Sequence, residues 1–231
     1  MKRVSVVSPV YDESGVVLIN LVESLMAMLG DQLQEIIFVY SPATPEACRS
    51  ILYKLQASDI KVGIICQQHP GYGGAVRDGI DWATGDLTLM IDSDGEMRIE
   101  DVPKLLQCLD VTGADLVIAS RWMKGGGTKG YGKFKYILNR GFQQIFRVLY
   151  ATDLHDLTLG YKLGKTSELK KMQLTSKDQE VCTEITLKAL KAGLKVKEIP
   201  TVWTARKTGA STNPLSRNWK YAKVAMNILF M

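Results

Sequence analysis

Apolar and polar residues follow two alternating patterns through the first half of the chain. Short apolar runs of strand length occupy residues 4–11, 35–40, 61–67, 87–91 and 114–120. Between them, apolar residues recur at helical spacing in residues 16–30, 45–56, 69–85 and 101–113, the third of these segments opening with a glycine-rich loop. This regular alternation up to Ser120 predicts an α/β fold, a mostly parallel sheet with helices on both faces.

The pattern changes after Ser120. Residues 121–133 are rich in glycine and lysine and predict a mobile loop, and residues 134–150 predict an amphipathic helix. The apolar face of that helix either packs on the sheet or meets lipid, and its pattern favours packing. Strand-like residues 156–163 and 195–203 flank a predicted helix at 178–193. The 231 residues, of ordinary globular composition, fit a single domain.

Three acids follow the apolar run at residues 87–91, namely Asp92, Asp94 and Glu96. In extended backbone, side chains two residues apart point the same way, so Asp92 and Asp94 are expected to converge. Converging carboxylates repel each other unless a cation lies between them, and their oxygens suit Mg²⁺ or Mn²⁺ held jointly with substrate phosphates. The competing interpretation is an exposed Ser-Asp-Gly turn without a ligand.

Charge is distributed unevenly along the chain, whose formal net charge is +5. Residues 1–119 contain 8 basic and 17 acidic side chains, whereas residues 120–231 contain 21 basic and 7 acidic ones. The first part therefore suits a cation, and the second suits an anion such as a phosphate, a nucleic acid or a membrane surface. The four cysteines lack CxxC spacing and predict buried, reduced thiols, and no apolar run has the length of a transmembrane helix.

Two charged residues within predicted helices are further candidates for a functional role. Arg77 follows the glycines of residues 71–74, and it either reaches a carboxylate or phosphate or remains a solvated helix charge. Glu184 lies on the apolar face of a predicted helix, where a carboxylate is either paired or functional.

The segments "PVYDE", "GYGGAVRDG", "DSD", "ASRW", "DLTLGYK", "TE" and "EIPTVWTARKTGAS" follow one another in this order. Together they resemble family 2 glycosyltransferases, in particular the branch of dolichyl-phosphate mannose synthase and related polyprenyl-phosphate sugar transferases, over residues 4–211. The resemblance implies a GT-A fold and one catalytic domain over residues 1–231. Within it we expect a nucleotide-sugar-binding half (1–119), an acceptor half (120–213) and an amphipathic C-terminal tail (214–231).

The resemblance also implies roles for individual residues. The nucleotide sugar is expected to meet Pro9, Tyr11, Glu13, Val39, Ser41, Asp92, Ser93, Asp94 and Arg206. The metal ligands are expected to be Asp92, Asp94 and Glu96, the acceptor-phosphate residues Arg121, Lys135 and Ser211, and the catalytic residues Asp94, Arg121 and Asp156. Two positions depart from the family pattern: Ser41 stands where an acid is usual, and Thr212 stands where a lysine is usual.

The function implied is an inverting transfer of a sugar from a GDP- or UDP-linked donor to a polyprenyl-phosphate-like lipid, with Mg²⁺ or Mn²⁺ as cofactor. We expect a cytoplasmic protein peripheral to an anionic membrane surface, and a membrane-protein partner stays open. One alternative is a hydroxyl acceptor, which would need a base such as Asp156. The others are a sugar nucleotidyltransferase and a nucleic-acid-binding module. We expect no nucleic-acid partner, because the basic residues lie in several elements without a recognised nucleic-acid motif.

Overall fold

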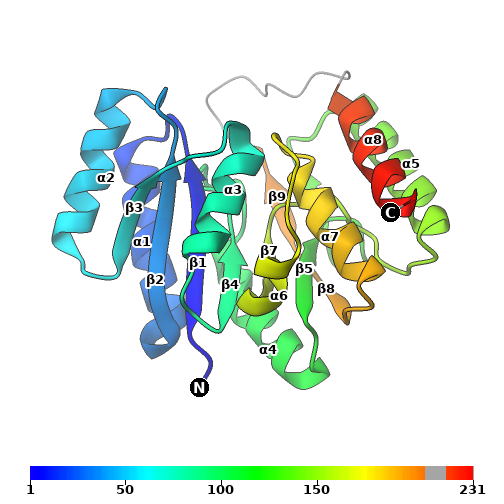
Figure 1. The fold of residues 1–231 in the computed structure, drawn as a ribbon, viewed down its shortest axis with the longest axis horizontal. Helices are drawn as coiled ribbons and strands as arrows, with labels where there is room; N and C mark the ends of the chain where they lie inside the picture. The colour runs from blue at the N-terminus through cyan, green and yellow to red at the C-terminus, as the bar shows by residue number, and fades with distance from the viewer. Residues whose placement is uncertain (206–216, 231) are drawn as a thin grey trace.

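The computed structural model describes residues 1–205 and 217–230, except the side chains of residues 133–135 and 217–218. Within these residues the centre is a seven-stranded sheet in the order β3-β2-β1-β4-β7-β5-β8 (Figure 1). Its strands are β1 (Val4–Val10), β2 (Leu33–Tyr40), β3 (Val62–Cys66), β4 (Leu87–Met90), β5 (Leu116–Ser120), β7 (Lys162–Lys165) and β8 (Val196–Pro200). Because only the pairings of β7 are antiparallel, the expected mostly parallel sheet is confirmed.

Helices cover both faces of the sheet. One face carries α1 (Gly15–Leu29), α2 (Glu46–Ser58) and α4 (Val102–Thr112), and the other carries α3 (Gly71–Trp82), α6 (Thr166–Lys171) and α7 (Val181–Lys191). Two short 3-10 helices, η1 (Gly30–Gln32) and η2 (Ile99–Asp101), join the first face to its strands. Each face of the sheet has its own hydrophobic core. Because successive side chains of β4 point to opposite faces, Leu89 packs with α1 and Met90 packs with α7.

The glycine-rich segment before Arg77 is not a loop, because α3 already begins at Gly71. A Cβ on Gly71 would lie 2.2 Å from the carbonyl oxygen of Lys177, and one on Gly73 would lie 2.2 Å from that of Ser176. The Gly73 N–H donates a hydrogen bond to the Lys177 carbonyl at 2.8 Å. These glycines therefore let the backbone of residues 176–177 pack directly on the first turn of α3.

The expectation of a loop over residues 121–133 is also wrong in part. Strand β6 (Gly127–Lys129) pairs in parallel with β9 (Val202–Thr204). The chain returns tightly to make this pairing, since a Cβ on Gly126 would lie 2.5 Å from the Ser120 carbonyl oxygen. Residues 126–129 are thereby held beside the end of β5.

Two further expectations need correction. The strand expected over residues 156–163 begins only at Lys162, because the Asp156 carboxylate accepts hydrogen bonds from the backbone N–H groups of Thr158 and Leu159 and holds a turn there. Cys66, expected to be buried, is exposed because it ends the edge strand β3. Cys108 is partly exposed, and the other two cysteines are buried.

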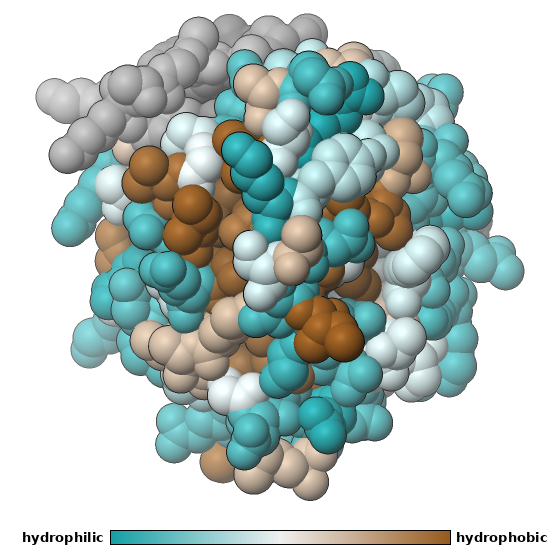
Figure 2. All heavy atoms as spheres, turned by 90° about the vertical axis from the view of Figure 1, so that its left-hand side faces the viewer, coloured by the Kyte–Doolittle hydropathy of each residue, from teal (hydrophilic) through white to brown (hydrophobic). Residues whose placement is uncertain are grey.

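Residues 15–32, comprising α1 and η1, form the one described segment that is long and apolar enough to cross a membrane by composition. One side of this segment, with Leu18, Leu21 and Leu25, is buried against the sheet, whereas Val16 and Ile19 on its other side are exposed. At the α2 end of the molecule, hydrophobic side chains show in separate areas among hydrophilic ones (Figure 2).

The last two helices, α5 (Lys133–Leu149) and α8 (Arg217–Phe230), lie side by side at the far end of the sheet from α2 (Figure 1). The rings of Phe142 and Tyr221 meet edge to face at 6.1 Å, and the Tyr150 hydroxyl donates to the Ala225 carbonyl at 2.5 Å. The outer side of α5 is different, because Ile137, Ile145 and Val148 are 68%, 58% and 80% exposed. Some apolar side chains of α5 therefore pack against α8, and others are exposed to solvent.

Candidate active site

A cavity of about 320 Å³ opens at the carboxyl ends of β1, β2 and β4, beside the start of α3. It is lined by Pro9, Val10, Tyr11, Glu13, Val39, Ser41, Gln67, Gly71, Tyr72, Ala75, Asp92, Ser93, Asp94 and Gln179. Eight of the nine residues expected at the nucleotide sugar are among them, and the ninth, Arg206, lies outside the described residues. The parallel strands end at one edge of the sheet and bring these distant segments together. We call this space the donor cavity.

Local hydrogen bonds fix the rim of the donor cavity. The Ser93 hydroxyl donates to the Pro9 carbonyl at 2.6 Å, which ties the end of β4 to the end of β1. The Glu13 carboxylate accepts the backbone N–H of Tyr11 at 2.7 Å. The Ser41 hydroxyl accepts the backbone N–H of Ala43 at 3.1 Å, so it closes its own turn and keeps its proton for another acceptor.

Hydrogen bonds orient two of the three acids that follow β4. Asp92 accepts the Tyr72 hydroxyl at 2.6 Å, and Asp94 accepts the backbone N–H of Glu96 at 3.0 Å. Across the described residues, no three His, Cys, Asp or Glu side chains form a preassembled metal site, and the expected roles of Asp92, Asp94 and Glu96 as metal ligands stay predictions. Two carboxylates on a cavity wall nevertheless fit Mg²⁺ or Mn²⁺, which take their other ligands from phosphates and water.

On the acceptor side, Arg121 and Asp156 form a buried ion pair. Nε and Nη2 of Arg121 donate to the two carboxylate oxygens at 2.7 and 3.0 Å, and the two side chains are 8% and 0% exposed. Burial alone would raise the pKa of Asp156, but the Arg121 charge and hydrogen bonds lower it below its usual range. The carboxylate therefore stays ionised and engaged, and the phosphate contact expected of Arg121 stays a prediction.

Two residues that the sequence did not single out hold this ion pair in place. Glu198 on β8 accepts the backbone N–H of Asp156 at 2.7 Å and that of His155 at 2.8 Å. Gln143 on α5 donates to the Thr158 hydroxyl at 2.9 Å. Neither has a local sequence signal, because each acts from a different element of the fold.

Lys162 is a further residue that sequence reasoning missed. Its side chain is fully buried, and its Nζ has no hydrogen-bond partner among the described residues. In the sheet it lies opposite Met90 and Ile118, between the strands that lead to Asp92 and Arg121. Burial lowers its pKa to about 8, although the nearby Cys182 thiol and carboxylates favour the charged form.

The other expected site residues have separate outcomes. Glu184 is paired: its carboxylate accepts the backbone N–H groups of Thr175 and Ser176 at 2.9 and 2.8 Å and lies 2.7 Å from Nζ of Lys188. Arg77 does not line the donor cavity. The side chain of Lys135 and all of Ser211 lie outside the described residues, so their expected phosphate contacts stay predictions.

The sequence profile of glycosyl transferase family 2 matches residues 5–172. The chain belongs to this family. A relative named polyprenol monophosphomannose synthase, from Mycolicibacterium smegmatis, is 31% identical over 147 residues, which are 61% of this chain and 55% of the relative. An undecaprenyl-phosphate mannosyltransferase of Micrococcus luteus is 27% identical over 220 residues, which are 90% of this chain and 86% of the relative.

A dolichol-phosphate mannosyltransferase of Pyrococcus furiosus is 26% identical over 215 residues, which are 90% of this chain but 58% of the relative. The chain thus spans little more than half the length of the Mycolicibacterium and Pyrococcus relatives. The predicted resemblance to family 2 is confirmed, while the roles of individual residues stay predictions.

Solved structures of the same fold confirm the expected GT-A architecture. Glucosyl-3-phosphoglycerate synthase of Mycobacterium tuberculosis, in complex with Mn²⁺, UDP and phosphoglyceric acid, superimposes with a TM-score of 0.71. The match has 17% identity and covers 99% of this chain and 78% of that enzyme. A complex of the same enzyme with Mg²⁺ and UDP gives a TM-score of 0.71 at 16% identity, covering 100% and 80% of the two chains.

Proposed function

We propose that this family 2 member is an inverting glycosyltransferase that moves a sugar from a UDP- or GDP-linked donor to a polyprenyl-phosphate-like lipid. The observation that carries the donor half is the donor cavity, where eight residues expected at a nucleotide sugar come together from three strand ends. The acceptor half is supported by the relatives, whose names contain polyprenol, undecaprenyl-phosphate and dolichol-phosphate.

Asp92 and Asp94 are the residues that would hold Mg²⁺ or Mn²⁺ together with the donor diphosphate. When bound, such an ion neutralises the charge that develops on the leaving diphosphate. The Tyr72 hydroxyl, hydrogen-bonded to Asp92, orients that carboxylate from α3, and the turn closed by Asp94 orients the second one. The protein thereby presents two preset oxygen ligands at the cavity wall.

The Arg121–Asp156 ion pair supports a phosphate acceptor over a hydroxyl acceptor. A hydroxyl acceptor needs a base, and Asp156 would have to leave a buried ion pair that occupies both of its oxygens. A phosphomonoester has a second pKa of about 6, so it is largely ionised near neutral pH and needs no base. The absence of a free carboxylate base at this position is then no obstacle to transfer.

Contact with an anionic membrane surface would bring the enzyme to such an acceptor. On α8, Trp219 and Phe230 are 75% and 79% exposed, and Lys223 lies on the same exposed side. The exposed apolar side chains of α5 lie on the neighbouring helix. Aromatic and lysine side chains beside apolar ones suit a membrane interface, where each basic residue contributes about 1 kcal/mol. We propose that this surface binds the cytoplasmic face of a membrane peripherally.

A transfer assay tests the proposal. Radiolabelled UDP- and GDP-sugars would be incubated with Mn²⁺ and, in separate reactions, with a polyprenyl phosphate in liposomes or with phosphoglyceric acid. We expect labelled lipid that is sensitive to mild acid and no labelled phosphoglycerate. Transfer only to phosphoglycerate would refute the lipid acceptor, and no transfer from any donor would refute the donor assignment.

A further inference from the structure

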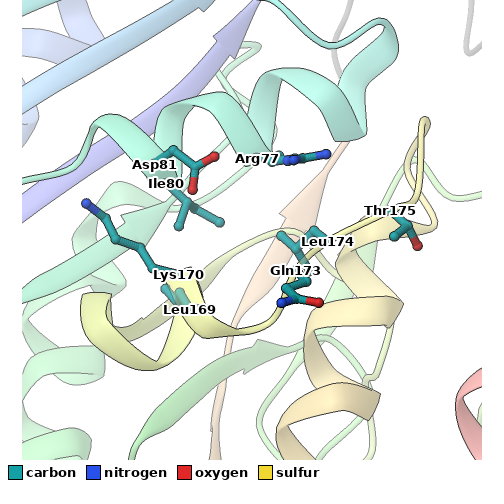
Figure 3. Close-up of a pocket in the computed structure, with 8 residues that line it drawn as sticks. All are labelled: Arg77, Ile80, Asp81, Leu169, Lys170, Gln173, Leu174 and Thr175. Atoms are coloured by element: carbon teal, nitrogen blue, oxygen red, sulfur yellow. The ribbon is translucent and has the colours of Figure 1, made fainter. Parts of the chain in front are cut away.

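A second cavity, of about 410 Å³, lies between α3, α6 and the chain that follows α6 (Figure 3). It is lined by Arg77, Ile80, Asp81, Leu169, Lys170, Gln173, Leu174 and Thr175, none of which lines the donor cavity. The volume falls within the range of small-molecule sites, about 300–1,000 Å³. Ile80, Leu169 and Leu174 lie beneath the groove and are almost fully buried, so its accessible surface comes mainly from the polar side chains that line it.

The polar groups of the groove include two cations without a protein partner. Among the described residues, no hydrogen bond or ion pair engages the guanidinium of Arg77 or the ammonium of Lys170. Figure 3 shows Arg77 reaching from α3 toward the side of Gln173 and Thr175, whereas Lys170 and Asp81 lie at the opposite end. The planar fork of an arginine fits a carboxylate or phosphate group, so the Arg77 end of the groove suits an oxyanion.

The wall opposite α3 is rigidly held. Nζ of Lys188 donates to the carbonyl oxygens of Met172 and Gln173 at 3.0 and 2.9 Å, and Glu184 holds the backbone of Thr175. Gln173 has a φ of 47°, a left-handed conformation that a non-glycine residue keeps only when its surroundings impose it. The groove is therefore preformed, which lowers the entropy cost of binding a ligand.

The groove and the donor cavity share the same two walls. Helix α3 gives Gly71, Tyr72 and Ala75 to the donor cavity and Arg77 to the groove. The chain after α6 continues from the groove to Gln179, which lines the donor cavity. Between the two cavities, the Gly73 N–H and the Lys177 carbonyl join these walls. A ligand in the groove and a nucleotide in the donor cavity would therefore contact the same helix and the same segment of chain.

We propose that this groove is an effector site for a small organic anion, whose carboxylate or phosphate binds Arg77 and whose remaining part lies between α3 and the chain that follows α6. Its occupancy changes the affinity of the donor cavity for nucleotide. The proposed binding of the anion depends on the groove alone. The proposed effect on nucleotide affinity rests also on the proposed function of the donor cavity.

The first experiment measures phenyl phosphate binding, with benzoate in a parallel series, by saturation-transfer NMR on the metal-free protein. Because a hydrogen bond to a charged group is lost, Arg77→Gln should weaken binding about tenfold or more, and Lys170→Gln should weaken it less. Lys171→Gln is the matched control, since this neighbouring lysine pairs with Glu168 and does not line the groove. Asp94→Asn should also leave binding unchanged, because it alters only the donor cavity.

The second experiment measures UDP binding with Mn²⁺ by calorimetry, with and without saturating phenyl phosphate. We expect the Kd for UDP to change about fivefold or more in the parent and not in Arg77→Gln, and the affinity for phenyl phosphate to change by the same factor when UDP is bound.

Several results would overturn the proposal. Binding that survives Arg77→Gln, binding lost in Asp94→Asn, or no binding of either probe would refute the groove as a site. Arg77-dependent binding without any change in the Kd for UDP would refute the effector role. Failure of UDP and Mn²⁺ to bind at all would refute the proposed function and the coupling, while Arg77-dependent binding of phenyl phosphate would still establish the groove.

Discussion

Replacing Lys162 with methionine should stabilise the protein at neutral pH, by an amount that falls as the pH rises. In the unfolded chain a lysine keeps its proton up to its ordinary pKa of about 10.4, whereas burial lowers the pKa of Lys162 to about 8. Between these two pH values the unfolded chain binds more protons than the folded chain, so the free energy of unfolding of the parent rises with pH. The difference of roughly 2.5 pKa units corresponds to about 3 kcal/mol. Methionine fills a similar volume and has no charge to bury.

Urea unfolding of the parent and Lys162→Met, followed by circular dichroism from pH 7 to pH 10, measures this contribution. We expect the variant to be more stable by about 3 kcal/mol at pH 7 and the advantage to shrink toward zero above pH 10. Tyrosines that titrate in this range affect both proteins and cancel in the difference. Lys171→Met is the control, because that lysine is 70% exposed and should give no pH-dependent difference. A stability difference that stays constant from pH 7 to pH 10 would refute the reasoning, since it would mean that the buried ammonium remains solvated.

Three further predictions concern the ion, the acceptor side and the membrane. Asp94→Asn should abolish Mn²⁺-dependent binding of UDP or GDP in calorimetry without changing the thermal unfolding temperature, and unchanged nucleotide binding would show that the metal assignment is wrong. Asp156→Asn should lower the free energy of unfolding by about 3–5 kcal/mol, because Arg121 would be left as a buried charge without its partner; a loss below about 1 kcal/mol would show that water replaces the carboxylate. The protein should sediment with anionic liposomes at low salt and less at high salt, and Trp219→Ser with Lys223→Glu should weaken this binding at low salt; no sedimentation of the parent at low salt would refute the membrane surface.

The sequence by itself determined the layered α/β fold and most of the donor cavity. Apolar runs separated by amphipathic helices can be buried in few other ways, and parallel strands place their carboxyl ends on one edge. Residues that follow different strands, such as Glu13, Ser41 and Asp92, were therefore predictable neighbours before any contact was known. The segment predicted to be helical over residues 16–30 likewise ends at Gly30, which follows α1 with a positive φ, a conformation that glycine adopts without strain.

Only the tertiary structure decided which polar residues are engaged with one another. Glu198 holds the turn of Asp156 from β8, and Lys162 is buried because β7 runs antiparallel between β4 and β5. Neither fact follows from local periodicity, since strand direction and long-range pairing depend on how segments distant in the chain pack together. The same reason separates Arg77 from the donor cavity: its position on α3 was readable, but the wall it faces is formed by residues nearly a hundred positions later in the chain.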